Sequence, residues 1–469
     1  MGDKTFFISL YLLHNYSKFS KLTIGIYGGD ILKKTTGAIA LLLTVIFTFT
    51  SCFFNDNSQQ ETTTPTNTSI SKTDINDYTD KYTAVKLTYG YNGLNTENQR
   101  ECYNKIAQNS SVITEKKSDS GFYCSNPITL PKDINEEDIF IALTAYNYDN
   151  PGDFWLEESF LTTTYSDKVV LELCSFYSPK EITECSKVLD NKVTEILSSM
   201  PHGLSEFQRE LYIHDYVVEN CSYNDTAAET LNNDQADHYH SAFTIYGALV
   251  EGKAVCQGYT DAMSYLLSCV GIENTSISGT SQNANHIWNA VKIEDSWYYL
   301  DATWDDNAFE EAGEGYKYDY FNLTTEQLQV NHTIGKKFID LSVEEITGGD
   351  SDLGCNFNIF IPECTNTENN YYVQEGAVLT GFTNDDDNQM GQELLAVAES
   401  GEEYYHIYVD PDYLDFSYAA EHLFDPYVYN YQYYVNVANE SLSDCQLEYS
   451  ASIVKKESLN VITVKLDYN

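Results

Sequence analysis

The sequence has few basic side chains. Lysine and arginine together number 26, against 71 aspartates and glutamates, so the formal net charge at pH 7 is −45. Phosphate backbones are bound by clusters of Lys and Arg, which makes nucleic acid an unsuitable partner for this chain. The acidity is expected to keep the protein soluble rather than to recognise a ligand.

The chain also lacks a long apolar run. The one candidate, Ala38–Phe49, follows two lysines and is too short for a comfortable transmembrane helix, but it has the layout of a signal peptide. It leads into Thr50-Ser51-Cys52, which resembles the lipobox of bacterial lipoproteins and predicts lipidation of Cys52. Residues 1–52 are therefore expected to be a signal peptide with a lipobox, and the mature protein to be an extracytoplasmic, membrane-anchored lipoprotein.

Two features leave alternatives open at this end of the chain. Phe49 stands where a lipobox usually has Leu, so an uncleaved anchor or ordinary cleavage nearby is the alternative. The residues before Lys33 fit no signal-peptide design, and a start at Leu32 would give a compact leader that begins with two lysines. We therefore expect translation to start later than Met1, which the intact mass of the precursor would test.

No CxxC motif occurs among the eleven cysteines, and no histidine accompanies a cysteine at ligand spacing. A zinc site is therefore not expected, and neither a metal nor another cofactor is predicted. Without Cys52 and one cysteine for chemistry, nine remain, which is an odd number. The sequence permits several disulfides without fixing their connectivity, among them Cys102–Cys124, Cys174–Cys185 and Cys355–Cys364.

Composition and periodicity divide the chain into modules. Residues 53–80 are rich in Thr, Asn, Ser and Asp, which indicates a disordered tether. Residues 81–200 are expected to form a small α+β N-terminal module. Its predicted strands lie at 84–91 and 164–177 and its predicted helices at 93–110 and 178–200. Pro201 and Gly203 mark the next boundary.

Residues 201–345 hold the densest set of expected elements. An amphipathic helix over 204–225 is followed by a helix, a short loop and a second helix that begins at or beside Cys256. Two strand-like runs, 286–293 and 297–304, come next. After a linker, residues 346–469 are expected to form a C-terminal module of unknown role, with strands and one helical stretch near 415–440.

Cys256 lies in the motif GKAVCQGYTDA, at the start of a predicted helix. The unpaired N–H groups of a first helical turn favour a thiolate, which is the form that attacks carbonyl carbon. Glycines at 252 and 258 let the backbone approach on both sides of the sulfur, and the cysteine's own N–H could donate to an oxyanion. The alternative role, a small buried hydrophobic residue, fits Cys221 and Cys269 better.

A base and its acceptor follow about thirty residues later. If the two strand-like runs pair through a loop of two residues, His286 faces Thr303 and Asp301 is its diagonal neighbour on the same side of the sheet. Diagonal neighbours have α-carbons about 7–8 Å apart, close enough for an imidazole and a carboxylate to meet. An odd loop would turn one of them to the other face, so the spacing permits the pair without requiring it.

Together, the motifs VCQGYTDAM, NHIWNAV and WYYLDATWDD resemble the Cys, His, Asp signature of the transglutaminase-like superfamily in order and spacing. The resemblance is strongest to bacterial members described as transglutaminase/protease-like and related to a cytokinesis protein, and it covers roughly residues 200–335. It implies a papain-like fold and a thioester acyl-enzyme on Cys256, with His286 as general base and then acid and Asp301 orienting the imidazole. The N-terminal module is similar to a leader domain of clostridial relatives.

The expected fold class is therefore α+β, with a papain-like/transglutaminase-like core, a small α+β N-terminal module and a β-rich C-terminal module. Four side chains are assigned to binding. Trp288 and Trp304 flank the His and the Asp and are expected to wall the cleft, with a place in the core as the alternative. Tyr246 and Gln257 are candidates for a second oxyanion donor.

Other polar residues favour simpler interpretations. His214 is expected on a helix surface or in the core, while His238 and His240 could be a metal pair on a loop. Asn384–Asn388 suggests a calcium loop, but Met390 stands where such a loop needs Gly, which favours a solvated turn.

Three functions follow from these residues. A cysteine protease or amidase would cleave a bond in a protein or a peptidoglycan peptide, and an acyltransferase would crosslink through the same thioester. A protein- or cell-wall-binding module would keep the fold with an inert triad. The intact triad disfavours the binding module, and a surface location, where water is the abundant nucleophile, favours hydrolysis over transfer.

Overall fold

The computed structural model describes residues 6–14, 18–26, 81–230, 239–282, 284–306, 317–346, 357–428, 430–443, 446–449 and 452–469. Cys52, the apolar run before it and the expected tether lie outside these ranges, so the lipobox and the signal peptide stay predictions. None of the helices in the described ranges combines the length and the apolar character that a membrane crossing needs.

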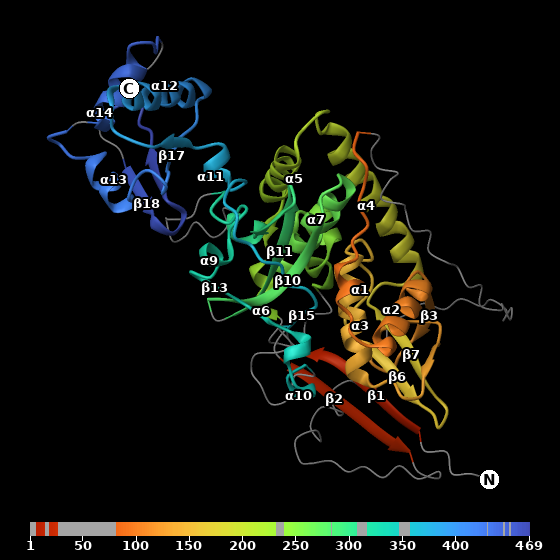
Figure 1. Ribbon diagram of the computed structural model, residues 1–469. Coiled ribbons are helices and arrows are strands. Elements are labelled where there is room, and N and C mark those ends of the chain that lie inside the picture. Colours follow the sequence, from red (N-terminus) through yellow and green to blue (C-terminus); the bar gives the residue numbers. More distant parts are fainter. Residues whose placement is uncertain are drawn as a thin grey trace, which may run out of the picture.

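The N-terminal module is an antiparallel sheet with helices beside it (Figure 1). Its strands, extended by an N-terminal hairpin, are β1 (Phe6–His14), β2 (Lys18–Ile26), β3 (Ile113–Lys117), β4 (Tyr123–Ser125), β5 (Ile128–Pro131), β6 (Phe160–Thr164) and β7 (Lys168–Ser175). They lie in the order β2-β1-β6-β7-β4-β3, with β5 paired to β7. The helices are α1 (Tyr89–Gly93), α2 (Glu97–Asn109), α3 (Glu136–Asp149) and α4 (Pro179–Ser199).

Capping boxes set the starts of α2 and α4. The hydroxyls of Thr96 and Ser178 accept the N–H of the third helical residue, and the side chains of Gln99 and Glu181 return the bond. These two helices, like β7, lie where the sequence pattern predicts them.

The strand predicted at 84–91 is wrong. This segment is extended but has no partner strand, since the Val85 N–H donates to the oxygen of Ser268 (2.8 Å) and α1 begins at Tyr89. Leu87 is buried between two exposed neighbours. An extended chain lying on other elements therefore shows the same alternation as a strand in a sheet.

Residues 201–345, called the catalytic module after the role expected for Cys256, pack helices against a small antiparallel sheet. The strands are β10 (Asn274–Ser281), β11 (Ala284–Ile293), β12 (Ser296–Leu300) and β13 (His332–Ile334), in the order β12-β11-β10-β13. The helices and helical turns are α5 (Glu206–Asn220), α6 (Asp225–Thr230), η3 (His240–Phe243), η4 (Gly247–Glu251), α7 (Cys256–Cys269), α8 (Ala302–Asp305) and α9 (Thr325–Leu328). A short parallel pair, β8 (Ser222–Tyr223) and β9 (Lys253–Ala254), precedes α7.

The hairpin of β11 and β12 has a loop of two residues, the even number that a pair of His286 and Asp301 on one side of the sheet requires. Ile293 pairs with Ser296, and the loop residues Glu294 and Asp295 both have positive φ, at 49° and 69°. Positive φ at both positions belongs to the type I′ turn, whose twist matches that of the strands.

The strand predicted over 297–304 is too long. β12 ends at Leu300, so Thr303 does not face His286 across the sheet. The chain turns into α8 because Asp301 Oδ1 accepts the N–H groups of Thr303 (3.0 Å) and Trp304 (3.2 Å). An aspartate that caps a helix in this way ends the strand.

The C-terminal module has a four-stranded sheet with helices packed on it. Its strands are β16 (Ala377–Leu379), β17 (Tyr404–Val409), β18 (Ser452–Lys456) and β19 (Val461–Lys465), in the order β16-β17-β19-β18. Its helical elements are α11 (Tyr371–Gln374), α12 (Asn384–Ser400), α13 (Phe416–His422), α14 (Asn430–Asn439) and η7 (Glu457–Leu459). The segment leading to it holds β14 (Lys336–Lys337), η6 (Phe338–Asp340), α10 (Val343–Ile346) and β15 (Phe357–Asn358).

The solvated turn predicted at Asn384–Asn388 is wrong. These residues form the first turn of α12, where Thr383 accepts the N–H of Asp386 and the Asp386 side chain returns the bond. Carboxylates are favourable at a helix start because the first N–H groups carry partial positive charge. The module therefore holds more helix than its alternating runs indicate.

The N-terminal and catalytic modules share two hydrophobic cores. One core joins Trp155 of the N-terminal module to Ile213 of α5 and Met263 of α7. The other joins Leu171 of β7 to Ile287 of β11. The sheet that carries the candidate site is therefore supported directly by the N-terminal module.

The C-terminal module has a core of its own and a second contact with the catalytic sheet. The helices α12 and α14 cover its strands around Leu394 and Tyr434. A smaller cluster packs Tyr372 and Val461 against Trp288, which lies on β11. Figure 1 shows this module at the upper left, with α11 on its side toward the catalytic module.

The described cysteines are free thiols: Cys102, Cys124, Cys174, Cys185, Cys221, Cys256, Cys269 and Cys364. Cys124 lies opposite Cys174 across the β4–β7 pair. The pairings Cys102–Cys124 and Cys174–Cys185, which the sequence permits, are not formed here.

Candidate active site

Cys256 is the first residue of α7. The chain reaches it through Gly252, which has a φ of +67°, and through β9. A Cβ atom on Gly258 would lie 2.9 Å from the backbone oxygens of Ala242 and Thr244. The two glycines therefore allow the turn before Cys256 and the close packing after it.

Hydrogen bonds fix α7 against the strand that carries His286. Thr260 Oγ1 donates to the oxygen of Ile287 (3.0 Å), and Asn289 Nδ2 donates to the oxygen of Thr260 (3.1 Å). All three residues are buried, so water does not compete for these bonds. The first turns of α7 and the middle of β11 are held at a fixed separation.

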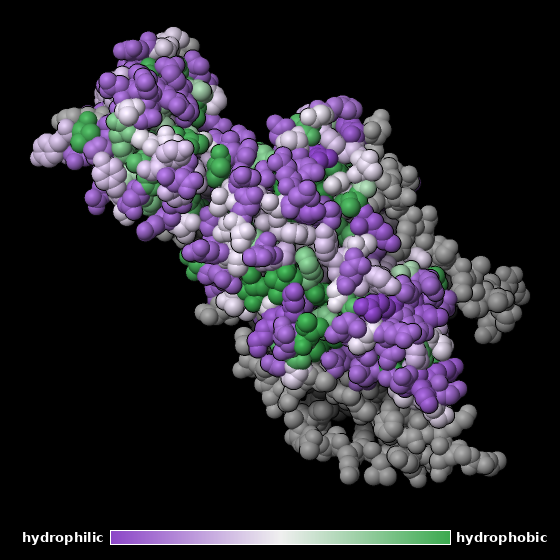
Figure 2. Space-filling view, in the orientation of Figure 1, coloured by the Kyte–Doolittle hydropathy of each residue, from purple (hydrophilic) through white to green (hydrophobic). Residues whose placement is uncertain are grey.

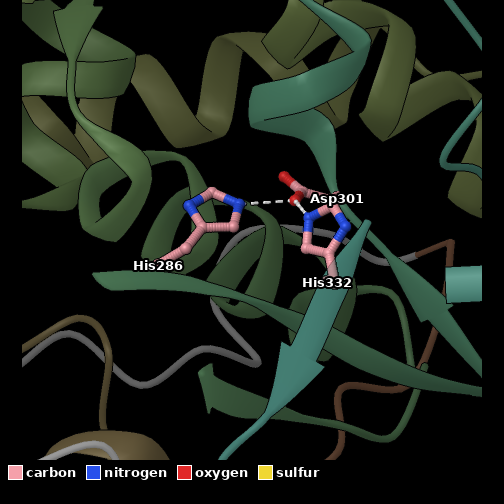
Figure 3. A group of neighbouring side chains, drawn as sticks. All are labelled: His286, Asp301 and His332. Atoms are coloured by element: carbon pink, nitrogen blue, oxygen red, sulfur yellow. Dashed lines mark hydrogen bonds and ion pairs between the residues drawn. The ribbon is translucent and has the colours of Figure 1, made fainter. Parts of the chain in front are cut away.

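His286 lies between Cys256 and Asp301. Its Nε2 is 2.5 Å from Asp301 Oδ2, as Figure 3 shows. The Cys256 side chain lies close enough to the imidazole to contribute to the raised pKa of His286, and Nδ1 is the ring nitrogen that Asp301 does not engage. The structure thus brings together the three residues that the sequence predicts, while their catalytic role stays a prediction.

Opposing effects set the charge of this group. Burial would lower the pKa of His286, but the charge and hydrogen bond of Asp301, together with the Cys256 side chain, outweigh it and raise the pKa to about 10. Burial would likewise raise the pKa of Asp301, yet His286 and His332 hold it well below its usual range. At neutral pH the arrangement is an imidazolium beside a carboxylate.

A second histidine, which no pattern in the sequence predicts, lies at this carboxylate. His332 Nε2 is 3.1 Å from the same Oδ2 of Asp301, and the His332 side chain has no exposed surface (Figure 3). His332 begins β13, a strand of three residues that is too short to show a periodic pattern. The only signal in the sequence is a histidine within the segment that closes the catalytic module.

The two tryptophans have different environments. Trp288 is 1% exposed, and its ring centroid lies 5.6 Å from that of His286 and 5.2 Å from that of His332. It is therefore a core residue behind the histidines, which is the alternative that the sequence left open. Trp304 is half-buried, with its ring 5.3 Å from that of His332, and remains the candidate for a cleft wall.

Tyr246 and Gln257 have polar partners other than Cys256. The Tyr246 hydroxyl lies near the side chain of Cys185, which contributes to raising the pKa of Tyr246 after the larger effect of burial. Gln257 Nε2 donates to Asp261 Oδ1 (2.9 Å). Their role as a second oxyanion donor stays a prediction.

The remaining histidines of interest have structural surroundings. His214 is fully buried with Nε2 3.2 Å from Asp305 Oδ2, so the core interpretation is correct. His240 contacts the ring of Tyr177 at 4.5 Å, and its predicted metal partner, His238, lies outside the described residues.

One group of described residues could hold a metal ion. The ligating atoms of His286, Asp301 and His332 lie within 4.8 Å of one another, a set of donors that suits a divalent transition metal. Both contacts between imidazole and carboxylate have hydrogen-bond lengths. Protons on the two Nε2 atoms therefore satisfy the carboxylate without a metal.

Residues 197–302 match the model of the transglutaminase-like superfamily, which confirms the resemblance and the α+β class for this segment. No curated protein matches the chain. Two solved structures are similar to 31% of it. One is a TGase at 12% identity and a TM-score of 0.23, with 43% of that chain covered. The other is a candidate cysteine protease from Cytophaga hutchinsonii at 13% identity and a TM-score of 0.19, with 56% covered. The match spans about half the length of these solved chains.

Proposed function

We propose that this chain, with its transglutaminase-like segment, is a cysteine enzyme that cleaves peptide or amide bonds. The observation that supports this most directly is the place of His286, between the Cys256 side chain and Asp301 Oδ2. An imidazolium at this position can stabilise a thiolate on one side while the carboxylate fixes the ring on the other.

In this proposal the Cys256 thiolate attacks the carbonyl carbon of the substrate and forms a C–S bond. The N–H of Cys256, at the first position of α7, lacks an intrahelical acceptor and could donate to the oxyanion. The imidazolium of His286 then gives its Nδ1 proton to the leaving amine, the C–N bond breaks and a thioester remains. Water attacks the thioester, His286 takes the water's proton, and the carboxylic acid leaves as the thiolate re-forms.

Hydrolysis is proposed over crosslinking because water is the abundant nucleophile at the proposed surface location. Cys256 is half-buried, and the His286 side chain retains 8% exposure. Figure 2 shows a largely hydrophilic face with an apolar patch near the place where Figure 1 labels β10, β13 and α6. An exposed apolar patch suits the side chains of a polypeptide, so a protein or a peptidoglycan peptide is the proposed substrate.

The proposed location is the outer face of a membrane, through a lipid on Cys52. It rests on the charged and apolar pattern of residues 33–52. A metabolic label with a palmitate analogue in the native host, compared between the natural sequence and Cys52→Ala, tests this part separately.

Activity is tested with the purified chain on a peptide library, with and without amine donors. We expect cleavage products, and a trapped thioester whose mass maps to Cys256. Cys256→Ala abolishes both, whereas Cys269→Ala, at the other end of α7, changes neither. Amine-linked products in excess over cleavage would favour crosslinking. A Cys256→Ala protein that retains its full effect on cells would favour the binding module.

A further inference from the structure

His332 meets the catalytic carboxylate from the opposite edge of the sheet. It lies on β13, which pairs with β10, whereas His286 lies on β11 and Asp301 follows β12. In Figure 3 the two imidazoles point at the same oxygen from different strands. A histidine that only fills space in a core does not need polar partners at both ring nitrogens. His332 has one at each nitrogen, so packing alone does not explain its place beside Asp301.

That second partner is Asn331, whose Oδ1 lies 2.6 Å from His332 Nδ1. Aromatic rings enclose the imidazole as well, with the centroids of Trp288, Trp304 and Tyr320 at 5.2, 5.3 and 5.5 Å. The ring of His332 is therefore held at both nitrogens and on its faces. A side chain fixed in this way can fix its own partner.

Asp301 has used its whole capacity for hydrogen bonds. Oδ2 accepts from His286 and His332, and Oδ1 accepts the N–H groups of Thr303 and Trp304. An ionised carboxylate has about four lone-pair directions, so no direction is left for water. Because Oδ2 can only accept, the Nε2 of each histidine must carry a proton, which leaves His286 Nδ1 directed at the thiol.

We propose that His332 is a fourth residue of the site: a positioning residue that fixes Asp301 and, through it, the tautomer and orientation of His286. This inference rests on the proposed function of Cys256 and His286. His332 does not reach the thiol in this scheme; it acts through the carboxylate that it shares with His286.

The test compares two amides that differ by one methylene group. In His332→Gln the carboxamide nitrogen can reach the place of the imidazole Nε2 and donate to Asp301, whereas in His332→Asn it is too short. Alkylation of Cys256 by iodoacetamide, followed by mass spectrometry from pH 4 to 11, reports the thiolate without knowledge of the substrate. His406→Gln, in the C-terminal module, is the control histidine.

We expect His332→Asn to slow alkylation at neutral pH by about tenfold and to shift its pH midpoint upward, since one hydrogen bond to a charged group is lost. His332→Gln restores most of the rate and the midpoint, and on a cleaved peptide kcat changes while KM does not. Asn331→Ala, which leaves His332 in place but releases its Nδ1, gives a smaller change in the same direction. It serves as a second variant if His332→Asn does not fold.

The outcomes separate the two proposals. If Cys256 of the natural sequence reacts no faster than Cys221, the proposed function fails whatever His332 does. If Cys256 is reactive and depends on His286, but His332→Asn and Asn331→Ala both keep the natural rate and pH midpoint, the role of His332 is overturned alone. Equal losses in the Gln and Asn variants would also overturn it, because a donor to Asp301 would not be what matters.

Discussion

At the residue scale, the two carboxylate oxygens of Asp301 accept hydrogen bonds from different parts of the protein. One oxygen caps α8 and the other accepts both histidines, so the carboxylate links a backbone turn to the chemistry of His286. An amide at this position offers a donor in place of one acceptor, and that donor must face either the N–H groups of α8 or the N–H groups of the imidazoles. Replacement of Asp301 by Asn, which has the same shape, therefore costs at least one of these hydrogen bonds.

Substitution of the three residues is expected to rank them by role. Cys256→Ala leaves no nucleophile and no measurable activity. His286→Ala is nearly as severe, since proton transfer contributes about 10²–10⁴ in rate. Asp301→Asn is milder, because it disturbs the orientation of the ring rather than removing it. Values of kcat/KM for the purified variants check the order, and full activity in His286→Ala would show that another base operates.

The dependence on pH follows from the raised pKa of His286. The imidazolium that protonates the leaving amine persists below a pKa of about 10, so cleavage should fall as pH rises through that value. The same shift stabilises the fold fully below about 6.5, the unfolded value, and this stabilisation is lost as pH rises through about 10. Asp301→Asn moves the alkaline limb of the rate profile to lower pH. A limb that stays in place would show that Asp301 does not hold the proton.

The sequence permits a pair of His286 and Asp301, but it gives no sign that His332 joins them. The hairpin between the first two has strands long enough to show alternation, and counting its loop places them on one face. His332 lies on a strand of only three residues, so no period relates it to Asp301. Tertiary folding alone brings its imidazole to the carboxylate.

At the scale of elements, the pairing of β10 with β13 determines where His332 lies. Gly279 faces Ile334 in this pair, and a Cβ on it would lie 2.1 Å from the oxygen of Thr333 and 2.7 Å from the Trp288 ring. Both neighbours are backbone or core atoms, so β13 must shift to accept a methyl group.

Gly279→Ala should therefore lower the free energy of unfolding by about 1–3 kcal/mol and slow the alkylation of Cys256. Thr280→Ala, the next residue on β10, is the control and should change stability by less. Denaturant titration and the alkylation rate measure the two effects. A fully stable Gly279→Ala protein would mean that β13 does not pair with β10 as described.

Two elements show why patterns alone mislead at boundaries. The strand β12 stops before Asp301 because that side chain caps α8, and no apolar periodicity marks the change. The start of α12 could have been found, since Thr383 followed by an acid three residues later is a capping signal. The same carboxylates resemble calcium ligands in their spacing, although they lie at a helix start.

At the scale of the whole molecule, a buried ion pair joins the C-terminal module to the catalytic one. Lys456 at the end of β18 pairs with Asp319, and the side chains retain 10% and 12% exposure. The Tyr372 hydroxyl donates to the same carboxylate (2.5 Å). Removing one partner leaves a buried charge with less compensation.

Lys456→Met is expected to destabilise the protein by about 3–5 kcal/mol, because Asp319 keeps only part of its bonding. Lys455→Met, at the exposed neighbouring position, should have little effect. Thermal unfolding of both variants is the measurement. Similar melting temperatures for the two would show that the ion pair is not formed in solution.

The module boundaries expected at residues 200 and 345 follow changes in sequence composition. They do not follow the packing of the hydrophobic core. Pro201 and Gly203 do follow α4, yet Trp155 and Met263, on either side of them in sequence, occupy one core. Contacts between segments far apart in the chain leave no local pattern in the sequence. For this reason the sequence alone does not predict that the two modules share a core. It could predict that these segments contain strands and helices with apolar faces.

The Trp288 cluster bears on how this chain could have been assembled during evolution. Tyr372 and Val461 of the C-terminal module complete the packing behind the strand that carries His286. An unrelated module in place of the region after residue 360 would remove Tyr372 and Val461 from the cluster that holds Trp288. A replacement module would need an apolar face that matches this cluster. We therefore expect the catalytic and C-terminal modules to have been inherited together.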